Sequence, residues 1–336
     1  MKFLIAGLGS IGRRHIRNLW SLGERDIRLY RTHHSTLPED EFAGLPVEID
    51  LETALAWKPD AVIVTNPTAL HLDVAIPAAN KGCHLLLEKP ISHTVNRLDE
   101  LESIVQRNGV HVLVGFQFRF HPGLQRIAIL LKEGAIGRPL SGCAHWGEYL
   151  PGWHPWEDYR QGYSARRDLG GGVILTLSHP MDYLRWLLGE VEALWALVSR
   201  LGDLEIDVED TAEIGLHFAS GALGSLHLDY NQRPPFHTLE IIGTNGTIRW
   251  DNVSGAVSIY STIAKEGVPI EEWKTYPPPA GFERNNLFLD EMCHFLEVIQ
   301  GKVRPVCTLR DGRIALELAE AAYRSAKFGQ LEKVNY

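Results

Sequence analysis

The sequence feature that most constrains the fold is a glycine-rich turn near the start of the chain. Gly7-Leu8-Gly9-Ser10-Ile11-Gly12 follows an apolar run, residues 2–6, and opens a stretch of helical periodicity, residues 11–22. In a strand–turn–helix unit, the first glycine permits a tight turn, the second lets backbone approach a pyrophosphate, and the third packs helix against strand. Helix N-terminal amides then point at the phosphates. The alternative is a glycine turn without a ligand. The predicted contacts of a dinucleotide are Gly7, Gly9, Ser10, Ile11 and Gly12.

The first 120 residues alternate short apolar runs with stretches of helical periodicity. The runs are residues 2–6, 27–31, 61–65, 84–88 and 110–115, and the helical stretches include 11–22, 69–81 and 95–107. Such alternation is typical of βαβ units on a parallel sheet. We therefore expect an N-terminal Rossmann domain with a doubly wound parallel sheet over residues 1–120.

The pattern changes after Phe120. Strand-like runs occupy residues 141–150, 191–200, 212–218, 224–230, 238–243 and 247–250, and two helices are expected over 286–300 and 309–328. Asn245-Gly246 between two of these runs is a strong hairpin signal. Residues 121–336 are predicted to form an α+β domain with a large open, mostly antiparallel sheet, so the chain as a whole is α/β. An open, partly apolar sheet face requires cover, which predicts a homodimer or homotetramer.

Composition excludes several classes of protein. The 336 residues carry a formal net charge of −9, whereas a nucleic-acid-binding protein usually has a basic excess. No apolar run approaches the ~18 residues of a membrane span, and Arg13-Arg14 stands where a signal peptide would continue. The four cysteines form no C-x-x-C pair, and the fifteen histidines show no metal-ligand spacing. We expect a cytoplasmic protein with no nucleic-acid, membrane or metal partner.

The end of the second strand bears on the choice of dinucleotide. In a Rossmann domain, the carboxylate that binds the ribose 2′-hydroxyl of NAD lies about 20 residues after the glycine motif. Residues 29–35 contain no carboxylate, but Arg31 suits a 2′-phosphate and Thr32 supplies a further donor. The sequence thus favours NADP over NAD. The alternatives are an Arg31 that is solvated, or one that stacks on adenine without selecting.

Polar residues also follow the later strands of the first domain. The carboxyl ends of parallel strands line the ligand crevice of a doubly wound fold, so these residues are candidate cofactor contacts. The alternative for the group after residues 61–65 is a turn that caps the next helix through Thr68. The candidates are Thr65, Asn66, Pro67, His71 and Gln117.

Glu88-Lys89-Pro90 closes the strand at residues 84–88. Partial desolvation would lower the pKa of a lysine at this position, and its charge can stabilise an alkoxide. The ordinary alternative is a solvated surface charge. Glu88 and Lys89 are therefore predicted as cofactor-binding residues, and Lys89 also as a catalytic residue.

Three consecutive glycines, residues 170–172, precede an apolar, helix-like segment. Within it Thr176, His179 and Asp182 have i, i+3, i+6 spacing, which predicts that they share roughly one helix face. A histidine facing a cleft can shuttle a hydroxyl proton. The alternative is a buried histidine that is satisfied within the core.

These motifs together resemble the Gfo/Idh/MocA family, named after glucose–fructose oxidoreductase and inositol dehydrogenase. The resemblance covers nearly the whole chain and rests on the N-terminal glycine motif, on Glu88-Lys89-Pro90, and on the glycines 170–172 with His179. It implies an NAD(P)-dependent oxidoreductase of sugars, amino sugars, cyclitols or nucleotide sugars. It also implies a Rossmann domain followed by a domain whose large open sheet often makes oligomer contacts.

The resemblance assigns roles to particular residues. Lys89 corresponds to the lysine that contacts nicotinamide and substrate, and His179 to the histidine of proton transfer. Many members carry an aspartate three residues before that histidine, where this chain has Thr176. A threonine cannot serve as general base at pH 7, so we assign proton transfer to Lys89 and His179 together.

Residues 149–163 are dense in tyrosine, tryptophan and histidine. Aromatic faces with polar tips suit sugar rings, although a loop that packs its own aromatic residues is the alternative. Arg119 leaves the last Rossmann strand at the same predicted cleft. The predicted substrate contacts are Arg119, Tyr149, Trp153, His154, Tyr163, Thr176 and His179.

Three functions compete at this stage. The first is an NAD(P)-dependent dehydrogenase or reductase acting on a sugar-like CH–OH group. The second, which Thr176 keeps open, is a non-catalytic NADP(H)-binding regulatory protein of the same fold. The third is an interaction module built around the open sheet, against which the glycine motif argues.

Overall fold

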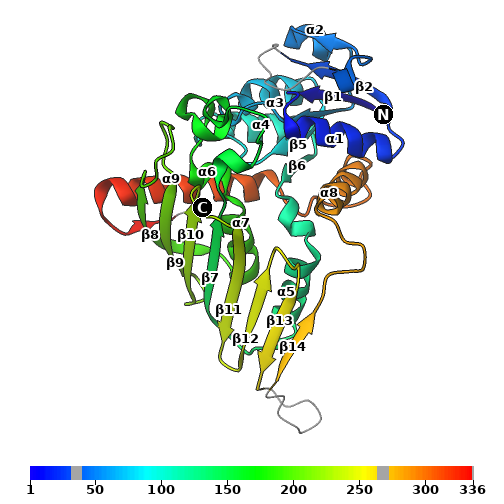
Figure 1. Cartoon of the computed structure of the whole chain (residues 1–336). Coiled ribbons are helices and arrows are strands. Elements are labelled where there is room, and N and C mark those ends of the chain that lie inside the picture. Colours follow the sequence, from blue (N-terminus) through cyan, green and yellow to red (C-terminus); the bar gives the residue numbers. More distant parts are fainter. Residues whose placement is uncertain (32–39, 263–271, 335–336) are drawn as a thin grey trace. The chain divides into compact units, whose positions relative to one another are not determined.

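The computed structural model describes residues 1–31, 40–262 and 272–334 (Figure 1). The chain divides into two compact units, each built from separate segments. The first comprises Met1–Gln117, Gln161–Gly171 and Arg284–Leu316, and the second comprises Phe118–Arg160, Gly172–Glu283 and Glu317–Tyr336. The division of function between residues 1–120 and 121–336 stays a prediction.

The first unit contains a six-stranded parallel sheet within its described residues. Its strands are β1 (Lys2–Ala6), β2 (Asp26–Tyr30), β3 (Val47–Glu48), β4 (Ala61–Val64), β5 (His84–Glu88) and β6 (Val112–Gly115). Their order is β3-β2-β1-β4-β5-β6, and every neighbouring pair is parallel. The order reverses between β1 and β4, which is the topological switch point of a Rossmann fold. The predicted doubly wound domain is confirmed.

Helices of the first unit come from both ends of the chain. They are α1 (Ser10–Ser21), α2 (Leu51–Ala56), α3 (His71–Asn80), α4 (Leu98–Asn108), α8 (Arg284–Ile299) and the start of α9 (Leu309–Phe328). The helix α1 packs against α8, and α3 packs against α4. Strands β1 and β4 are buried along nearly their whole length, as expected for strands covered on both faces.

The second unit contains a nine-stranded mixed sheet in the described part of the chain. The strands are β7 (Pro139–Gly147), β8 (Val191–Ser199), β9 (Thr211–Phe218), β10 (Leu223–Asp229), β11 (Phe236–Gly243), β12 (Gly246–Asp251), β13 (Val257–Ser261), β14 (Trp273–Tyr276) and β15 (Glu332–Lys333). Their order is β14-β13-β12-β11-β7-β10-β9-β8-β15, and only the β7–β10 pair is parallel. The predicted large, mostly antiparallel sheet is confirmed, as is the predicted hairpin between β11 and β12, whose turn residues are Thr244 and Asn245.

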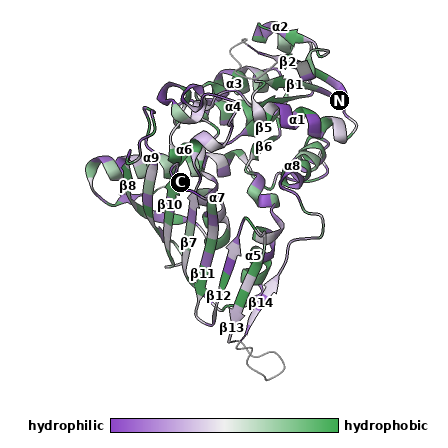
Figure 2. Cartoon of the chain, in the orientation of Figure 1, coloured by the Kyte–Doolittle hydropathy of each residue, from purple (hydrophilic) through white to green (hydrophobic). Residues whose placement is uncertain are grey.

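Among the described residues, helices cover one face of this sheet and none covers the other. The helix α5 (Pro122–Lys132) packs on β12 and β13, α6 (Val173–Thr176) on β9 and β10, and α7 (His179–Leu188) on β7. The strands alternate buried and exposed residues. Figure 2 shows hydrophobic and hydrophilic residues along the same strands. Large apolar side chains on the uncovered face are more than two-fifths exposed: Trp195, Leu197, Leu223, Phe236 and Ile242.

The predicted continuous helix after the three glycines is wrong. The structure contains two helices, α6 and α7, with Leu177 and Ser178 between them. Leu177 leaves the helical region at ψ 35°, so the i, i+3, i+6 argument does not apply. Among the described residues, no helix is both long enough and apolar enough to span a bilayer.

Candidate active site

In the glycine turn after β1, two glycines are required by packing and the third lies beside open space. Gly7 has φ +102°, and a Cβ there would lie 2.6 Å from the Asn66 amide nitrogen, while a Cβ at Gly12 would overlap the Gly7 carbonyl oxygen. Gly9 has ordinary extended backbone, and nothing lies within 4 Å of its Cβ position. The fold itself therefore requires Gly7 and Gly12. The open space at Gly9 is where a phosphate would approach the backbone.

The first backbone amides of α1 are suited to bind an anion. Gly9 is the N-cap residue and offers no side chain to the first amides of the helix. Two of the predicted dinucleotide contacts lie in the first turn of α1: Ser10 is exposed, and Ile11 is half-buried. Because N-terminal amides have no partner within a helix, they are available to a phosphate.

The polar residues after β4 hold their own turn. The Thr65 hydroxyl donates to the carbonyl oxygens of Ala6 and Gly7, at 3.0 and 2.9 Å. The Asn66 side-chain amide donates to the Leu70 carbonyl at 3.0 Å, and His71 Nε2 lies 2.9 Å from the Asn66 carbonyl oxygen.

Pro67 precedes the short 3₁₀ turn Thr68–Leu70 and provides no side-chain cap. Burial lowers the pKa of His71 to about 4, so its ring is neutral at physiological pH. These hydrogen bonds fit the turn that was left open as an alternative, although the predicted helix cap by Thr68 is absent.

Arg31 follows β2 directly and is buried, with 8% of its surface exposed. Its amide donates to the Glu48 carbonyl at 3.1 Å, which fixes the backbone at the strand end. Thr32 lies outside the described residues. The position of Arg31 at the carboxyl end of β2 is the one that a ribose-selecting residue occupies in a Rossmann fold.

Glu88 and Lys89 stand at the carboxyl end of β5, on the same sheet edge as the glycine turn. Glu88 Oε1 lies 2.9 Å from His15 Nε2, and Oε2 accepts the Lys89 amide at 3.2 Å. Burial lowers the pKa of the half-buried Lys89 ammonium to about 8; Glu88 opposes this shift and Arg284 adds to it. A lysine of this kind exchanges its proton near physiological pH.

A second carboxyl group lies behind Glu88. Glu291 on α8 is fully buried, and neither of its oxygens has a hydrogen-bond partner among the described residues. Burial, with the charge of Glu88, raises the pKa of Glu291 well above its usual range. Glu291 therefore binds its proton more tightly than an ordinary carboxyl group does, while Glu88 is bound to His15.

Tyr163 and Gln117 also belong to the first unit. Burial raises the pKa of the Tyr163 hydroxyl, and the charge of Glu88 adds to the shift. The structure thus brings Tyr163 within electrostatic range of the Glu88-Lys89 pair. Gln117 is buried and begins a 3₁₀ turn, Gln117–Phe120, one residue beyond the end of β6.

The three consecutive glycines have packing reasons of their own. A Cβ at Gly170 would lie 2.9 Å from that of His93, and one at Gly171 would overlap the Tyr163 carbonyl oxygen. In the second unit, Gly172 has φ +110°, and its Cβ would overlap the Glu209 carboxylate. Close approach of neighbours explains all three glycines without a ligand.

Thr176 and His179 lie on either side of the break between α6 and α7, and both are buried. The His179 ring packs edge-on against Phe118, with centroids 4.9 Å apart, and face-on against Trp146 at 5.7 Å. His179 is thus held in an aromatic cluster of the second unit, and its role in proton transfer stays a prediction.

Arg119 is committed to a buried ion pair. Its Nε and Nη2 atoms donate to the two carboxylate oxygens of Asp182, at 2.9 and 2.7 Å, and the guanidinium lies over Trp186. The bidentate pair gives Arg119 and Asp182 a structural role, because each compensates the other's buried charge. This geometry disfavours the prediction that Arg119 binds substrate.

The aromatic segment before the glycines is dispersed within the second unit. Tyr149 lies under the Arg233 guanidinium, 4.0 Å from ring centre to carbon, and lines a cavity of about 620 Å³. Trp153 packs edge-on against Tyr230, and His154 packs against Trp156. Each of these three residues therefore has an aromatic or cationic neighbour of its own.

Two polar residues near His179 were not predicted. His237 on β11 stacks on Trp146 with parallel rings 4.3 Å apart, and it lies 3.2 Å from the Tyr183 hydroxyl. Both side chains are buried. The alternation along β11 was the available signal, because it points His237 to the same side as Leu239 and Ile241.

The chain belongs to the GFO/IDH/MocA family of oxidoreductases. Residues 1–116 match the family's NAD-binding Rossmann-fold domain, and residues 124–249 match its C-terminal domain, together more than half of the chain. The resemblance stated from the motifs is thereby confirmed. The chain is an NAD-binding oxidoreductase, and nothing in the comparisons favours the non-catalytic alternative.

Individual proteins are similar along the whole length. The chain is 29% identical to myo-inositol 2-dehydrogenase of Thermotoga maritima, covering 97% of this chain and 96% of that protein. A solved structure of levoglucosan dehydrogenase in complex with NADH has a TM-score of 0.87 at 20% identity, covering 100% and 99% of the two chains. The WlbA dehydrogenase of Bordetella pertussis, solved with NADH and UDP-GlcNAcA, has a TM-score of 0.81 at 24% identity, covering 100% and 99%. The two solved structures establish the shared fold.

Proposed function

We propose that this protein transfers a hydride between a nicotinamide cofactor and a CH–OH carbon of a sugar-like compound: a sugar, amino sugar, cyclitol or nucleotide sugar. Lys89 and His179 are the proposed proton-transfer residues. The observation that carries the proposal is the half-buried Lys89, whose pKa burial lowers to about 8, at the end of β5. The relatives' names, which include dehydrogenases of a cyclitol and an anhydrosugar, support this substrate class.

The residues of the first unit fit a dinucleotide. Gly9 leaves open space beside uncapped helix amides, which suits the pyrophosphate. Arg31 follows β2 on the adenosine side of the switch point, and Lys89 follows β5 on the other side, so the two fit opposite ends of one extended cofactor. When bound, the nicotinamide supplies the hydride acceptor or donor.

Lys89 is suited to hold or release a proton at Nζ. Near pH 8 its ammonium and amine forms are both populated, so in the oxidation direction the amine can accept a hydroxyl proton. In the reverse direction the ammonium stabilises the developing alkoxide and returns the proton. The Glu88 carboxylate, fixed by His15, keeps the adjacent backbone in place.

His179 is the second proposed proton-transfer residue. Thr176, which stands three residues before it, has no charge to polarise the imidazole. We propose Thr176, Tyr163, Tyr149, Trp153 and His154 as substrate contacts. The aromatic cluster around His179 would then keep the ring oriented.

The pH dependence of turnover tests the role of Lys89. In the oxidation direction, kcat/KM should rise through an inflection near pH 8, the pKa of Lys89. Lys89→Arg keeps the charge but removes the titration, so the inflection should disappear and turnover should fall by about 10²–10⁴-fold. An inflection that persists in Lys89→Arg would assign the titration to another group, and His179→Asn then identifies whether that group is His179.

We further propose NADP as the preferred cofactor. The support is Arg31 at the end of β2, together with the lack of a carboxylate between residues 29 and 35. Fluorescence titration with NADPH and with NADH decides the point. Tighter NADPH binding is expected, and equal binding would remove Arg31 as a selecting residue.

The uncovered sheet face supports a proposal about assembly. Trp195, Leu223 and Phe236 stand exposed on one face of the nine-stranded sheet, and association of two such faces would bury them. We propose a homodimer or homotetramer in the cytoplasm. Light scattering that gives the mass of a single chain would refute the oligomer, and cell fractionation tests the location.

A further inference from the structure

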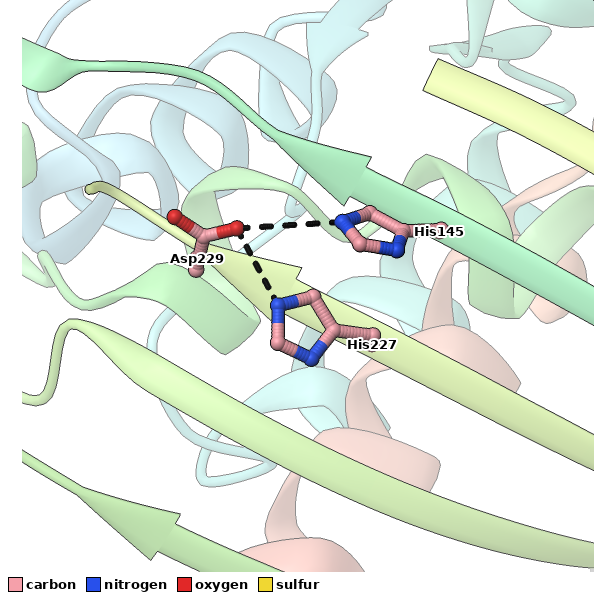
Figure 3. Close-up of side chains that lie close together, drawn as sticks. All are labelled: His145, His227 and Asp229. Atoms are coloured by element: carbon pink, nitrogen blue, oxygen red, sulfur yellow. Dashed lines mark hydrogen bonds and ion pairs between the residues drawn. The ribbon is translucent and has the colours of Figure 1, made fainter. Parts of the chain in front are cut away.

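Two histidines and an aspartate converge on the uncovered face of the second sheet (Figure 3). His145 lies on β7, and His227 and Asp229 lie on the adjacent β10. These two strands are the parallel pair of the sheet, and their register sets His145 beside His227 and Gly147 beside Asp229. The imidazole rings consequently lie side by side, with centroids 4.3 Å apart.

The distances among their ligand atoms are those of a small coordination site. Asp229 Oδ2 lies 3.1 Å from His227 Nε2 and 4.0 Å from His145 Nε2. Zinc bonds of about 2.0–2.1 Å at tetrahedral angles place neighbouring ligand atoms roughly 3.3 Å apart. His145 Nε2 lies roughly 0.7 Å farther from Asp229 Oδ2 than this spacing, and the ligand atoms of all three residues lie within 4.8 Å of one another.

Backbone amides hold the Asp229 carboxylate in position. Its other oxygen, Oδ1, accepts the amides of Asn231 and Gln232 at 2.6 and 2.5 Å. A Cβ at residue 147 would overlap Asp229 Oδ2, so the glycine beside it on β7 leaves the space that this oxygen occupies. Backbone donors and a glycine thus aim Oδ2 at the two imidazoles, with both Oδ1 bonds already satisfied elsewhere.

A further carboxylate orients the central histidine. Glu213 on β9 lies 2.5 Å from His227 Nδ1, which leaves Nε2 facing Asp229 and His145. A carboxylate bound to the distal nitrogen of a histidine ligand fixes its tautomer and orientation, a pairing that recurs around protein metal sites. Glu213 is therefore a positioning residue rather than a ligand.

The site also borders a cavity. His227 and Asp229 line the cavity of about 620 Å³, together with Tyr149, Tyr159 and Arg233. Three protein ligands with a fourth position open to a cavity is the arrangement of a metal that binds an exchangeable water or small molecule. Imidazole nitrogens favour Zn²⁺, Ni²⁺ or Cu²⁺ over Mg²⁺ and Ca²⁺, which prefer all-oxygen sites.

We propose that His145, His227 and Asp229 bind a divalent transition-metal cation, with Zn²⁺ as the reference ion and Glu213 orienting His227. A coordinating imidazole must be deprotonated, so binding is best measured at mildly alkaline pH. The site is independent of the dinucleotide residues, all of which belong to the first unit.

The whole chain is first stripped of metal with a chelator and then dialysed to equilibrium against Zn²⁺. Metal analysis of the dialysed protein measures the bound Zn²⁺ and tests the proposal. One Zn²⁺ per chain is expected. His145→Ala and His227→Ala should each weaken binding by more than about 100-fold, and Glu213→Gln by about 10-fold. Co²⁺ should give the intense visible absorption of a tetrahedral site, and both histidine variants should lose it.

A matched control is available on the same sheet face. His217 on β9 is exposed and has its own carboxylate partner, Glu192, at 3.6 Å. His217→Ala should leave Zn²⁺ binding unchanged, and the melting temperature without metal checks that every variant is folded. The proposal is overturned if the wild type takes up no stoichiometric Zn²⁺, or if folded His145→Ala and His227→Ala variants bind it as tightly as His217→Ala does.

Discussion

Replacement of Gly9 by serine should move cofactor affinity and fold stability in opposite directions. A Cβ at Gly9 meets nothing within 4 Å, and φ −73° and ψ −173° are accessible to any residue. Gly9 is the N-cap of α1, so a serine hydroxyl there can accept from the amides of Ile11 or Gly12. The helix should gain a few tenths of a kcal/mol, which changes the melting temperature by about 2 °C or less.

The same change occupies the amides that the pyrophosphate needs. Losing one hydrogen bond to a charged group costs about 1.5–3 kcal/mol, so the Kd for the dinucleotide should rise by roughly 10- to 150-fold. Nicotinamide fluorescence measures the Kd, and calorimetry measures the melting temperature. Gly12→Ala is the contrast, because its Cβ overlaps the Gly7 carbonyl oxygen and should destabilise the fold by about 1–3 kcal/mol. The reasoning is refuted if Gly9→Ser binds the dinucleotide as tightly as the wild type, or if it loses affinity and stability together.

Three further changes test other parts of the structure. Arg31→Ala should raise the Kd for NADPH by about 10-fold and leave that for NADH unchanged; equal losses would indicate a structural role. Asp182→Asn should lower the free energy of unfolding in urea by about 3 kcal/mol because it leaves Arg119 buried without its counter-charge, whereas the Arg119→Met/Asp182→Leu double variant should recover most of it. Glu291 has a raised pKa in the folded state, so the wild type loses stability as pH rises above the usual carboxyl range. Glu291→Gln should therefore become the more stable protein at alkaline pH, with the difference growing by up to about 1.4 kcal/mol per pH unit, and a pH-independent difference would show that the carboxyl is ionised.

Local patterns predicted the elements that lie within one stretch of sequence. Strands β1 and β5 match their predicted runs residue for residue. The Asn-Gly signal located the hairpin between β11 and β12, although its turn residues are Thr244 and Asn245, one position earlier than the signal. The glycine turn could be interpreted from sequence because its three positions are close together, and the structure gives Gly7 and Gly12 a steric reason and leaves open space at Gly9.

Local sequence patterns could not predict features that depend on partners far apart in the chain. Asp182 was interpreted as a neighbour of His179, but its partner Arg119 lies 63 residues earlier. The break at Leu177 and Ser178 interrupts an apolar stretch that has uniform helical character in the sequence. The histidine pair on β7 and β10 depends on a parallel register that pairs residues 82 positions apart, so a search for ligand spacing along the sequence could not find it.

The first unit is built from chain segments that are synthesised at very different times, and this determines when it can finish folding. Asn18 receives a hydrogen bond from Asn285, 267 residues later, and Asp99 is paired with Arg313, 214 residues later. The β6 amide of Val114 likewise donates to the carbonyl of Cys307. A ribosome adding about 5–20 residues per second needs roughly 10–40 s to pass from residue 117 to residue 316. The nascent chain must therefore carry its nucleotide-binding unit unfinished until residues 284–316 emerge, with apolar sheet surface exposed to chaperones until then.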